Sequence, residues 1–292
     1  MIGLIGGTGL GEALFGEASI EERHIDTPFG APSSPVRLVE WHGLQIAMIA
    51  RHGVGHVFNP SQVPYRANIY ALKALGVTHI LASGAVGSLR EEIRPRELVI
   101  VDQVIDKTWR RTPTFFDEGL AVHVEFAEPF CPDLRRLLLD VADQVETRVH
   151  PRGTYVCMEG PAFSTVAESQ MHRAWGADVI GMTVMPEAKL AREAEMSYAL
   201  VALATDYDCW RPHEPNVDKQ KLLDEIIGNL NAATANAVAL LKAAVQRLAS
   251  RPPGKSSVHD ALALAIWSDR AKLSPEVFRR YGVLLEKYAD QT

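Results

Sequence analysis

Two aspartates, Asp206 and Asp208, stand two positions apart directly after the apolar stretch Ser197–Ala204. A protonated carboxyl group can donate a proton to a ring nitrogen, and an ionised carboxylate can accept a hydrogen bond from an exocyclic amine. If the chain bends where a buried strand ends, both side chains can point the same way. The pair therefore indicates an acid–base site for a nitrogen heterocycle, with a solvated loop or a helix cap as the alternative.

Three short segments rich in glycine, serine or basic residues also follow apolar stretches and are predicted loops: Gly6–Gly9, Arg51–Gly53 and Ser83–Ser88. Glycine lets backbone amides approach an anion closely, and the Arg51 guanidinium offers a fork suited to phosphate oxygens. Ligands of open α/β sheets bind at strand ends, so the segments together predict one oxyanion site rather than three unrelated turns. A dinucleotide loop is disfavoured, because Glu12 stands where the Gly-x-Gly-x-x-Gly motif needs its third glycine.

The elements that must position these residues alternate between strands and helices. Helices are predicted over Ser61–Leu75 and Asp218–Leu248, where apolar residues recur every three or four positions. Segments that are apolar on both faces are predicted strands of a covered sheet: Met1–Ile5, Gln45–Ala50, Thr78–Ala82, Glu97–Val101, Thr154–Met158, Asp178–Met182 and Ser197–Thr205. This alternation predicts an α/β fold.

The C-terminal part follows the segment Ser250–Ser257, in which a proline pair and a glycine cannot continue the long helix. Beyond it, His259–Trp267 is apolar enough to pack as a helix, and Ser274–Glu276 is typical of an N-cap and first turn. We expect a domain over 1–249, a linker over 250–257 and C-terminal helices over 258–292, packed on the same domain or on a neighbouring subunit.

The overall composition disfavours several classes of protein. The 292 residues carry 30 basic and 36 acidic side chains, and the net charge of −6 argues against a nucleic-acid binder. Three widely separated cysteines favour neither a disulfide framework nor a metal site. The N-terminus lacks the features of a signal peptide, and no apolar run reaches the roughly 18 residues of a spanning helix. We therefore expect a soluble, cytoplasmic protein without a membrane partner.

Beyond these patterns, the chain resembles the trimeric purine nucleoside phosphorylase family over almost its whole length, and most closely the branch that acts on S-methyl-5′-thioadenosine. The resemblance is carried by ordered motifs: IGGTGL (Ile5–Leu10), DTPFG (Asp26–Gly30), ARHG (Ala50–Gly53), NPSQVPYRANI (Asn59–Ile69), GSLREEI (Gly87–Ile93), AEPFC (Ala127–Cys131), EGPAFST (Glu159–Thr165), AESQM (Ala167–Met171), WGADVIGMT (Trp175–Thr183), PEA (Pro186–Ala188) and ATDYDCW (Ala204–Trp210). It implies a single-domain phosphorylase/hydrolase-like fold, with a twisted, mixed central β-sheet flanked by helices and a C-terminal helical extension.

The resemblance also implies an enzyme of the pentosyltransferase class and assigns roles to residues by position in the motifs. Asp206 would protonate N7 of the departing base and Asp208 would accept from its 6-amino group, which makes both the catalytic candidates. Met182 would lie against the ribose. Further substrate-binding candidates are Phe163, His123 and Val217, specificity candidates are Ser164 and Lys219, and phosphate-binding candidates are Thr8, Arg51, His52, Gly84, Ala85 and Thr183.

Two positions depart from the family pattern. Ala162 stands where relatives often have arginine, and Lys219 stands where they place an apolar residue near the 5′ substituent, although Val217 is close enough to replace it. His123 matches a histidine that reaches a neighbouring subunit in relatives, which favours a homotrimer or a dimer of trimers. The resemblance implies neither a metal nor an organic cofactor, since inorganic phosphate is a co-substrate.

The reaction predicted from the resemblance is phosphate-dependent conversion of S-methyl-5′-thioadenosine to adenine and 5-methylthioribose 1-phosphate, in methionine and purine salvage. The nearest alternative is a phosphorylase of 6-oxopurine nucleosides or methylthioinosine, which the Asp206 and Asp208 pair disfavours. A nucleoside hydrolase would not need phosphate, and a non-catalytic purine- or phosphate-binding protein would release no base. Assays of phosphate-dependent base release distinguish these alternatives.

Overall fold

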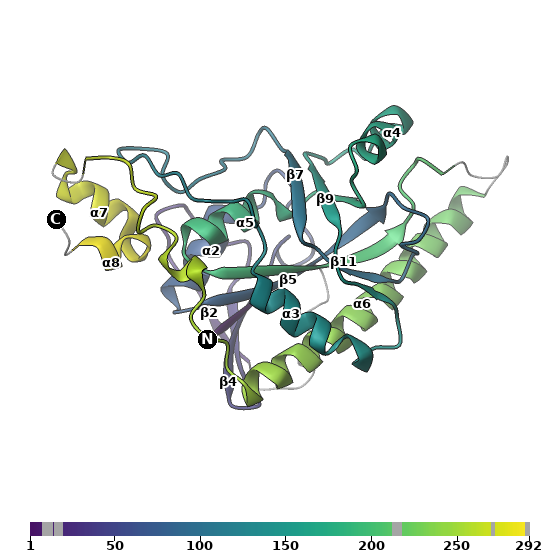
Figure 1. Cartoon of the computed structure of the whole chain (residues 1–292), viewed down its shortest axis with the longest axis horizontal. Helices are drawn as coiled ribbons and strands as arrows, with labels where there is room; N and C mark the ends of the chain where they lie inside the picture. The colour runs from purple at the N-terminus through teal and green to yellow at the C-terminus, as the bar shows by residue number, and fades with distance from the viewer. Residues whose placement is uncertain (8–13, 15–19, 212–217, 270–271, 290–292) are drawn as a thin grey trace.

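The computed structural model of the chain describes residues 1–7, 14, 20–211, 218–269 and 272–289. The strands are β1 (Ile2–Gly6), β2 (Glu21–Arg23), β3 (Val36–Trp41), β4 (Leu44–Ala50), β5 (His79–Ser88), β6 (Leu98–Ile100), β7 (Gln103–Lys107), β8 (Val149–His150), β9 (Thr154–Met158), β10 (Val179–Gly181) and β11 (Ser197–Asp206). The helices are α2 (Tyr65–Ala74), α3 (Pro132–Asp140), α4 (Val166–Ala174), α5 (Val184–Glu193), α6 (Lys219–Ser250), α7 (Pro275–Tyr281) and α8 (Glu286–Ala289), with 3₁₀ turns at Ala142–Gln144, Ser257–Asp260 and Gly282–Leu284. These elements build a mixed sheet flanked by helices, which confirms the predicted fold class (Figure 1).

Strand β5 lies at the centre of the sheet and is hydrogen-bonded to β1, β10 and β11. The strand order is β2-β3-β4-β1-β5-β10-β9-β7, and β11 connects β5 to β6 and β8. The β4–β1, β1–β5 and β5–β11 pairs are all parallel. The carboxyl ends of these four strands therefore meet at one edge of the sheet, where ligand sites of α/β folds form.

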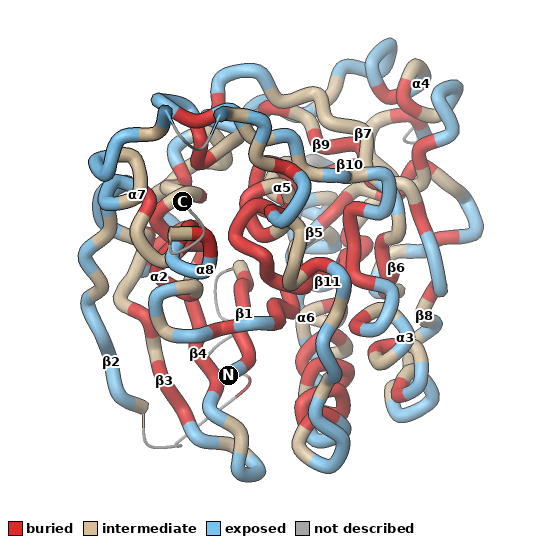
Figure 2. The backbone as a smooth tube through the Cα atoms, turned by 60° about the vertical axis from the view of Figure 1, so that its left-hand side comes forward, coloured by how far each residue is buried: buried red, intermediate tan, exposed pale blue. Residues whose placement is uncertain are grey.

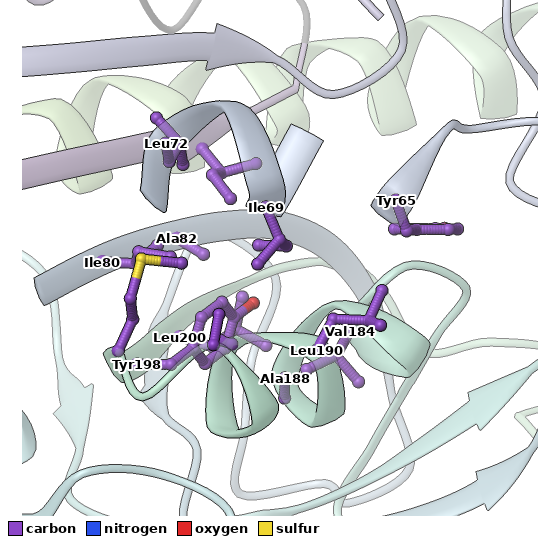
Figure 3. Packing of buried hydrophobic residues seen from close by; sticks show 14 of the residues in the cluster. Tyr65, Ile69, Leu72, Ile80, Ala82, Val184, Ala188, Leu190, Tyr198 and Leu200 are labelled. Atoms are coloured by element: carbon purple, nitrogen blue, oxygen red, sulfur yellow. The ribbon is translucent and has the colours of Figure 1, made fainter. Parts of the chain in front are cut away.

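The core covers both faces of the sheet, as the alternation along β11 shows. Tyr198 and Leu200 belong to one buried cluster, which also holds residues of α2, α5 and the C-terminal part, whereas Ala199 and Val201 belong to a second cluster with α3 and α6. Figure 2 shows the resulting buried strands inside an exposed shell. Figure 3 shows the first cluster, in which Ile69 of α2 faces the strands. Strands buried on both faces explain why the sequence segments are apolar without alternation.

The segment Ser83–Ser88 was expected to be a loop, and this prediction was wrong because β5 continues through Ser88. Its residues pair with β11 as far as Asp206 and then with β10. The continuous pairing with β11, joined by β10 at Gly87, outweighs the weak strand propensity of Gly84 and Gly87. The small residues instead leave space above the sheet for side chains from neighbouring elements.

The long helix α6 covers the predicted range Asp218–Leu248, but its buried face differs in one place. Leu230 continues the apolar spacing of Leu222 and Ile226 in the sequence and was expected on the buried face. It is 37% exposed, whereas Asn229 is 5% exposed. Asn229 precedes Ala233 and Ala237 at four-residue spacing, so it shares their buried face. None of the described helices, α6 included, has the combination of length and apolarity needed to cross a membrane.

The C-terminal segment packs against the domain, although its first helix is absent. Instead of a helix over His259–Trp267, the structure has a 3₁₀ turn at Ser257–Asp260, followed by a bridge between Ile266 and Val122. The backbone amide of His123 donates to Ala265 O at 2.9 Å, so contacts with the domain replace the hydrogen bonds of a helix. Helix α7 begins after Ser274 as expected, and Tyr281, Leu284 and Tyr288 join the first buried cluster.

Candidate functional site

The predicted acid–base pair lies at the carboxyl end of β11. The register of β11 with β5 shifts between Ala204 and Asp206, which makes Thr205 the extra residue of a β-bulge. Oδ1 of Asp206 accepts the backbone N–H of Asp208 at 2.7 Å, and Oδ2 of Asp206 lies 2.6 Å from the Thr205 hydroxyl. Asp208 has a φ of 50°, so the chain turns sharply after the strand.

Burial raises the pKa of Asp206 above its ordinary value. The hydrogen bonds from Thr205 and from the Asp208 amide oppose this shift, and the nearby Asp208 charge adds to it. A carboxyl group with a raised pKa holds its proton more readily, which suits a general acid.

Gly87 of β5 faces this pair. A Cβ atom at Gly87 would lie 3.1 Å from Asp206 Oδ1 and 3.2 Å from Asp208 Cβ. Any side chain at this position would therefore displace one of the two carboxyl groups. Asp206 and Asp208 form what we call the base side of the site.

The predicted phosphate residue Arg51 lies at the end of β4 and is 1% exposed. Its Nε and Nη2 atoms each donate to the Glu187 carboxylate of α5 at 2.7 Å, and Nη1 donates to Ser83 O at 2.8 Å. Tyr198 donates to the same carboxylate at 2.7 Å. A guanidinium has five N–H groups, so two N–H groups of Arg51 are left for an anion after these three bonds.

The electrostatics of Arg51 favour its charged state. Burial alone lowers its pKa, but the charge of Glu187 and its hydrogen bonds outweigh burial and raise the pKa further. The pair is therefore a fixed positive and negative charge within the domain.

Other predicted phosphate residues converge on Arg51. A Cβ atom at Gly84 would lie 3.4 Å from Thr183 Oγ1 and 3.9 Å from Arg51 Nη1. The loop before α5, the end of β4 and the centre of β5 therefore meet at one point. We call Arg51, Gly84, Thr183 and Glu187 the anion side of the site. Ala85 follows Gly84 in β5 and is exposed.

His52 is buried next to Arg51, with Nδ1 2.8 Å from Phe58 O and its ring stacked on that of His56 at 4.2 Å. Burial lowers the pKa of His52 to about 4, so the ring is neutral near pH 7. Because a carbonyl oxygen only accepts, Nδ1 carries the hydrogen and Nε2 is left as an acceptor. His52 can therefore accept a hydrogen bond from a protonated phosphate oxygen.

Met182 directly precedes Thr183 of the anion side and is held by a network that the sequence did not indicate. Arg111 donates through Nη1 to Met182 O at 2.6 Å and through Nη2 to Glu159 O at 2.6 Å. A Cβ atom at Gly160 would lie 2.5 Å from the Met182 sulfur, so this glycine permits the contact. Arg111 adjoins another arginine in the sequence, and no sequence pattern distinguishes the buried one from the exposed one.

Glu187 is the second functional residue that sequence reasoning missed. It falls within the motif Pro186–Ala188, which was used only as a sign of resemblance. A carboxylate between the apolar residues Val184–Pro186 and Ala188 was the available signal, because buried charges are normally paired.

The remaining predicted residues are distributed over the site and its surroundings. Ser164 adjoins the base side, since its carbonyl oxygen accepts from the Cys209 thiol at 3.2 Å, and Phe163 is 85% exposed. His123 instead packs on Trp267 of the C-terminal segment, at a ring distance of 4.8 Å. Thr8 and Val217 lie outside the described residues, and Lys219 is the first residue of α6. Among the described residues there is no cluster of His, Cys, Asp and Glu that could hold a metal ion.

Comparisons with known proteins identify the family of the chain. The family model of the phosphorylase superfamily matches residues 1–246. The chain is 46% identical to S-methyl-5′-thioadenosine phosphorylase from Synechocystis sp., covering 98% of this chain and 87% of that protein, and 45% identical to the enzyme of that name from Geobacter sulfurreducens, covering 99% of both.

Solved structures of methylthioadenosine phosphorylases also match this chain over most of its length. The crystal structure of a methylthioadenosine phosphorylase sourced from an antarctic soil metagenomic library matches with a TM-score of 0.89 at 46% identity, covering 97% of this chain and 98% of that chain. Methylthioadenosine phosphorylase from Schistosoma mansoni in complex with adenine matches with a TM-score of 0.81 at 35% identity, covering 91% of this chain and 98% of that chain.

Proposed function

The chain belongs to the phosphorylase superfamily, and from that premise we propose that it cleaves S-methyl-5′-thioadenosine with inorganic phosphate to adenine and 5-methylthioribose 1-phosphate. The observation that carries the proposal is the meeting of an anion side and a base side along β5. Gly84 and Gly87 are three residues apart, or roughly 10 Å along an extended strand. This spacing leaves room for a ribose between a bound phosphate and a bound purine.

In the proposed reaction a phosphate oxygen forms a bond to C1′ while the bond from C1′ to N9 of adenine breaks. Positive charge develops on the sugar and negative charge on the leaving base. Asp206 donates its proton to N7, so that adenine leaves as a neutral molecule. An acid at N7 and an anion at C1′ both stabilise the transition state more than the ground state, which is the condition for catalysis.

Asp208 gives the proposal its base selectivity. As a carboxylate it accepts a hydrogen bond from the 6-amino group of adenine, whereas a 6-oxopurine would place a second acceptor against it. Adenine nucleosides are therefore preferred over inosine and methylthioinosine. The names of the relatives from Synechocystis and Geobacter support the same substrate.

On the anion side, the two N–H groups left on Arg51 and the Thr183 hydroxyl donate to phosphate, with backbone amides at Gly84 and Ala85. Neutral His52 accepts from the phosphate oxygen that carries a proton. Thr8 completes this set in the proposal, as the resemblance implies. Phosphate is a substrate, and the proposed chemistry uses neither a metal ion nor an organic cofactor.

We also propose that the protein acts as a homotrimer in the cytoplasm, in methionine and purine salvage. Trp267 and Leu264 are 73% and 92% exposed beside His123, and grouped exposed apolar side chains suit burial against a second copy of the chain. Size-exclusion chromatography with light scattering measures the oligomeric state.

The function is tested by incubating the purified enzyme with S-methyl-5′-thioadenosine, adenosine, inosine and methylthioinosine, each with and without phosphate, and by measuring the released base. We expect adenine from the methylthio substrate only when phosphate is present. Release without phosphate would indicate a hydrolase. Cleavage of methylthioinosine at the same rate as the adenine counterpart would favour the 6-oxopurine alternative.

A further inference from the structure

Asn229 is a polar residue on the buried face of α6. It is 5% exposed and precedes the fully buried Ala233 and Ala237 by one and two helical turns. A buried amide in an apolar helix face is unfavourable unless its hydrogen bonds are made. The Nδ2 and Oδ1 atoms of Asn229 each have a hydrogen-bond partner, and both partners are bonded to the end of β11 or belong to it.

The first partner is the carbonyl of Thr205, which accepts from Asn229 Nδ2 at 3.0 Å. Thr205 is the extra residue of the β-bulge, so its backbone has no place in the regular hydrogen-bond ladder between β11 and β5. The helix thus supplies through Asn229 the donor that the sheet does not supply. This bond fixes the peptide unit that leads directly into Asp206.

The second partner determines which end of the amide faces Thr205. Nε of Arg96 donates to Asn229 Oδ1 at 2.7 Å, which requires the NH₂ group to point toward the bulge. Arg96 is itself attached to the same strand, since its backbone N–H donates to Ala204 O at 2.7 Å. Hydrogen bonds therefore link Asn229, Arg96 and the Ala204–Thr205 backbone in a ring at the end of β11.

The Thr205 side chain connects this arrangement to the Asp206 carboxyl group. Its hydroxyl lies 3.2 Å from Val86 O and 2.6 Å from Asp206 Oδ2. The residue is therefore held at its carbonyl by α6, and its hydroxyl lies between β5 and the Asp206 carboxyl group. A rotation of its peptide would turn Asp206 away from the site.

We propose that Asn229, oriented by Arg96, is a positioning residue that aims the Asp206 carboxyl group by holding the Thr205 carbonyl. This proposal rests on the proposed role of Asp206 as general acid. Misplacing a reacting group by about 1 Å can reduce a rate by roughly 100-fold. Loss of the Asn229 bond should therefore lower kcat by roughly 10- to 100-fold and leave the KM for phosphate within about threefold of the wild-type value.

Asn229→Asp is the sharpest variant, because it keeps the size of the side chain and the partner for Arg96 but cannot donate to Thr205 O. Asn229→Leu removes both hydrogen bonds at similar volume. Asn236→Leu is the matched control, since Asn236 lies on the same helix and donates to Arg96 O at 3.1 Å without touching Thr205. Circular dichroism and thermal melting identify any variant that fails to fold.

The kinetic assay uses S-methyl-5′-thioadenosine and phosphate, with Asp206→Asn as a second background. If Asn229 acts through Asp206, both Asn229 variants lose kcat, Asn236→Leu stays near wild type, and Asn229→Asp adds little to the loss already caused by Asp206→Asn. Two results would overturn the positioning role alone. One is an equal kcat for Asn229→Asp and the wild type. The other is a double variant, Asn229→Asp with Asp206→Asn, whose fold-loss in kcat equals the product of the two single losses. Absence of base release by the wild-type enzyme would instead overturn the proposed function together with it.

Discussion

The anion side is built on a buried ion pair, whereas Asp206 and Asp208 of the base side are only half-buried, and the two sides hold charge in different ways. On the anion side, Arg51 and Glu187 are each 1% exposed and share two hydrogen bonds of 2.7 Å. On the base side, the donors to Asp206 are a hydroxyl and a backbone amide, and burial raises its pKa. A fixed ion pair suits the binding of an anion, whereas a carboxyl group with neutral partners can gain and lose a proton.

The largest effect is expected from Asp206→Ala, which removes the proposed general acid of the base side. The leaving adenine would then have no positioned proton donor, and general acid catalysis contributes roughly 10²- to 10⁴-fold. We expect kcat to fall within that range while the KM for phosphate changes little. Steady-state kinetics with both substrates varied measure the two effects. Turnover within a few-fold of the wild type would remove Asp206 from the mechanism.

The anion side is tested by Glu187→Gln, which leaves the buried Arg51 charge without its counter-charge. Breaking a buried ion pair by removing one partner costs about 3–5 kcal/mol in the free energy of unfolding. We expect this loss in urea denaturation, together with a KM for phosphate that rises more than the KM for the nucleoside. Glu40→Gln, at an exposed position of β3, is the control for stability.

Equal increases in the two Michaelis constants of Glu187→Gln would show that the pair supports the domain as a whole. An unchanged free energy of unfolding would show that the pair is not the fixed charge that the structure indicates. Either result would weaken the distinction between the two sides.

Asp208→Asn tests selectivity within the base side. An unpaired buried polar group costs about 1–3 kcal/mol, so the wild type should prefer 6-amino over 6-oxo nucleosides by at least roughly tenfold. An asparagine can present either a donor or an acceptor. The variant should therefore show a smaller preference for 6-amino over 6-oxo nucleosides, mainly because it loses activity toward adenine nucleosides. The measurement is kcat/KM for methylthioadenosine and methylthioinosine. A wild-type enzyme that cleaves both equally contradicts the assignment.

The sequence predicted the base side more completely than the anion side. Asp206 and Asp208 are local in sequence and follow a long apolar strand, so the strand and the two carboxyl groups could be recognised together. The bulge at Thr205 and its donor Asn229 could not, because their relation depends on how α6 packs on the sheet, 24 residues further along the chain. A polar residue at an apolar helix position was the signal available for Asn229.

On the anion side, the convergence of Arg51 and Gly84 followed from the rule that parallel strands end at one edge. The pairing of Arg51 with Glu187 could not be predicted from the sequence, because the two residues are 136 positions apart and tertiary packing brings them together. The strand character of Ser83–Ser88 was also missed, since glycine and serine signal a turn unless a neighbouring strand, here β11, supplies hydrogen bonds.

The smallest effect is expected from His52→Gln, which tests the neutral histidine beside the fixed pair. Burial lowers the pKa of His52 from 6.5 to about 4, so the unfolded chain binds more protons than the folded one between these values. The free energy of unfolding of the wild type therefore falls as the pH falls from 6.5 toward 4. Glutamine does not titrate, so the fall measured by urea denaturation between pH 6.5 and 4.5 should be smaller by roughly 1–2 kcal/mol.

His79→Gln is the matched control for His52→Gln, because the pKa of His79 is also lowered to about 4 by burial but His79 lies at the opposite end of β5 from Ser88. Both variants should flatten the pH dependence of stability, and only His52→Gln should also raise the KM for phosphate. An unchanged pH dependence in His52→Gln would mean that His52 binds its proton equally well in the folded protein and in the unfolded chain, with a pKa near 6.5 in both. The anion side would then gain a second cation as the pH falls below about 6.5, and its charge would vary with pH as that of the base side does.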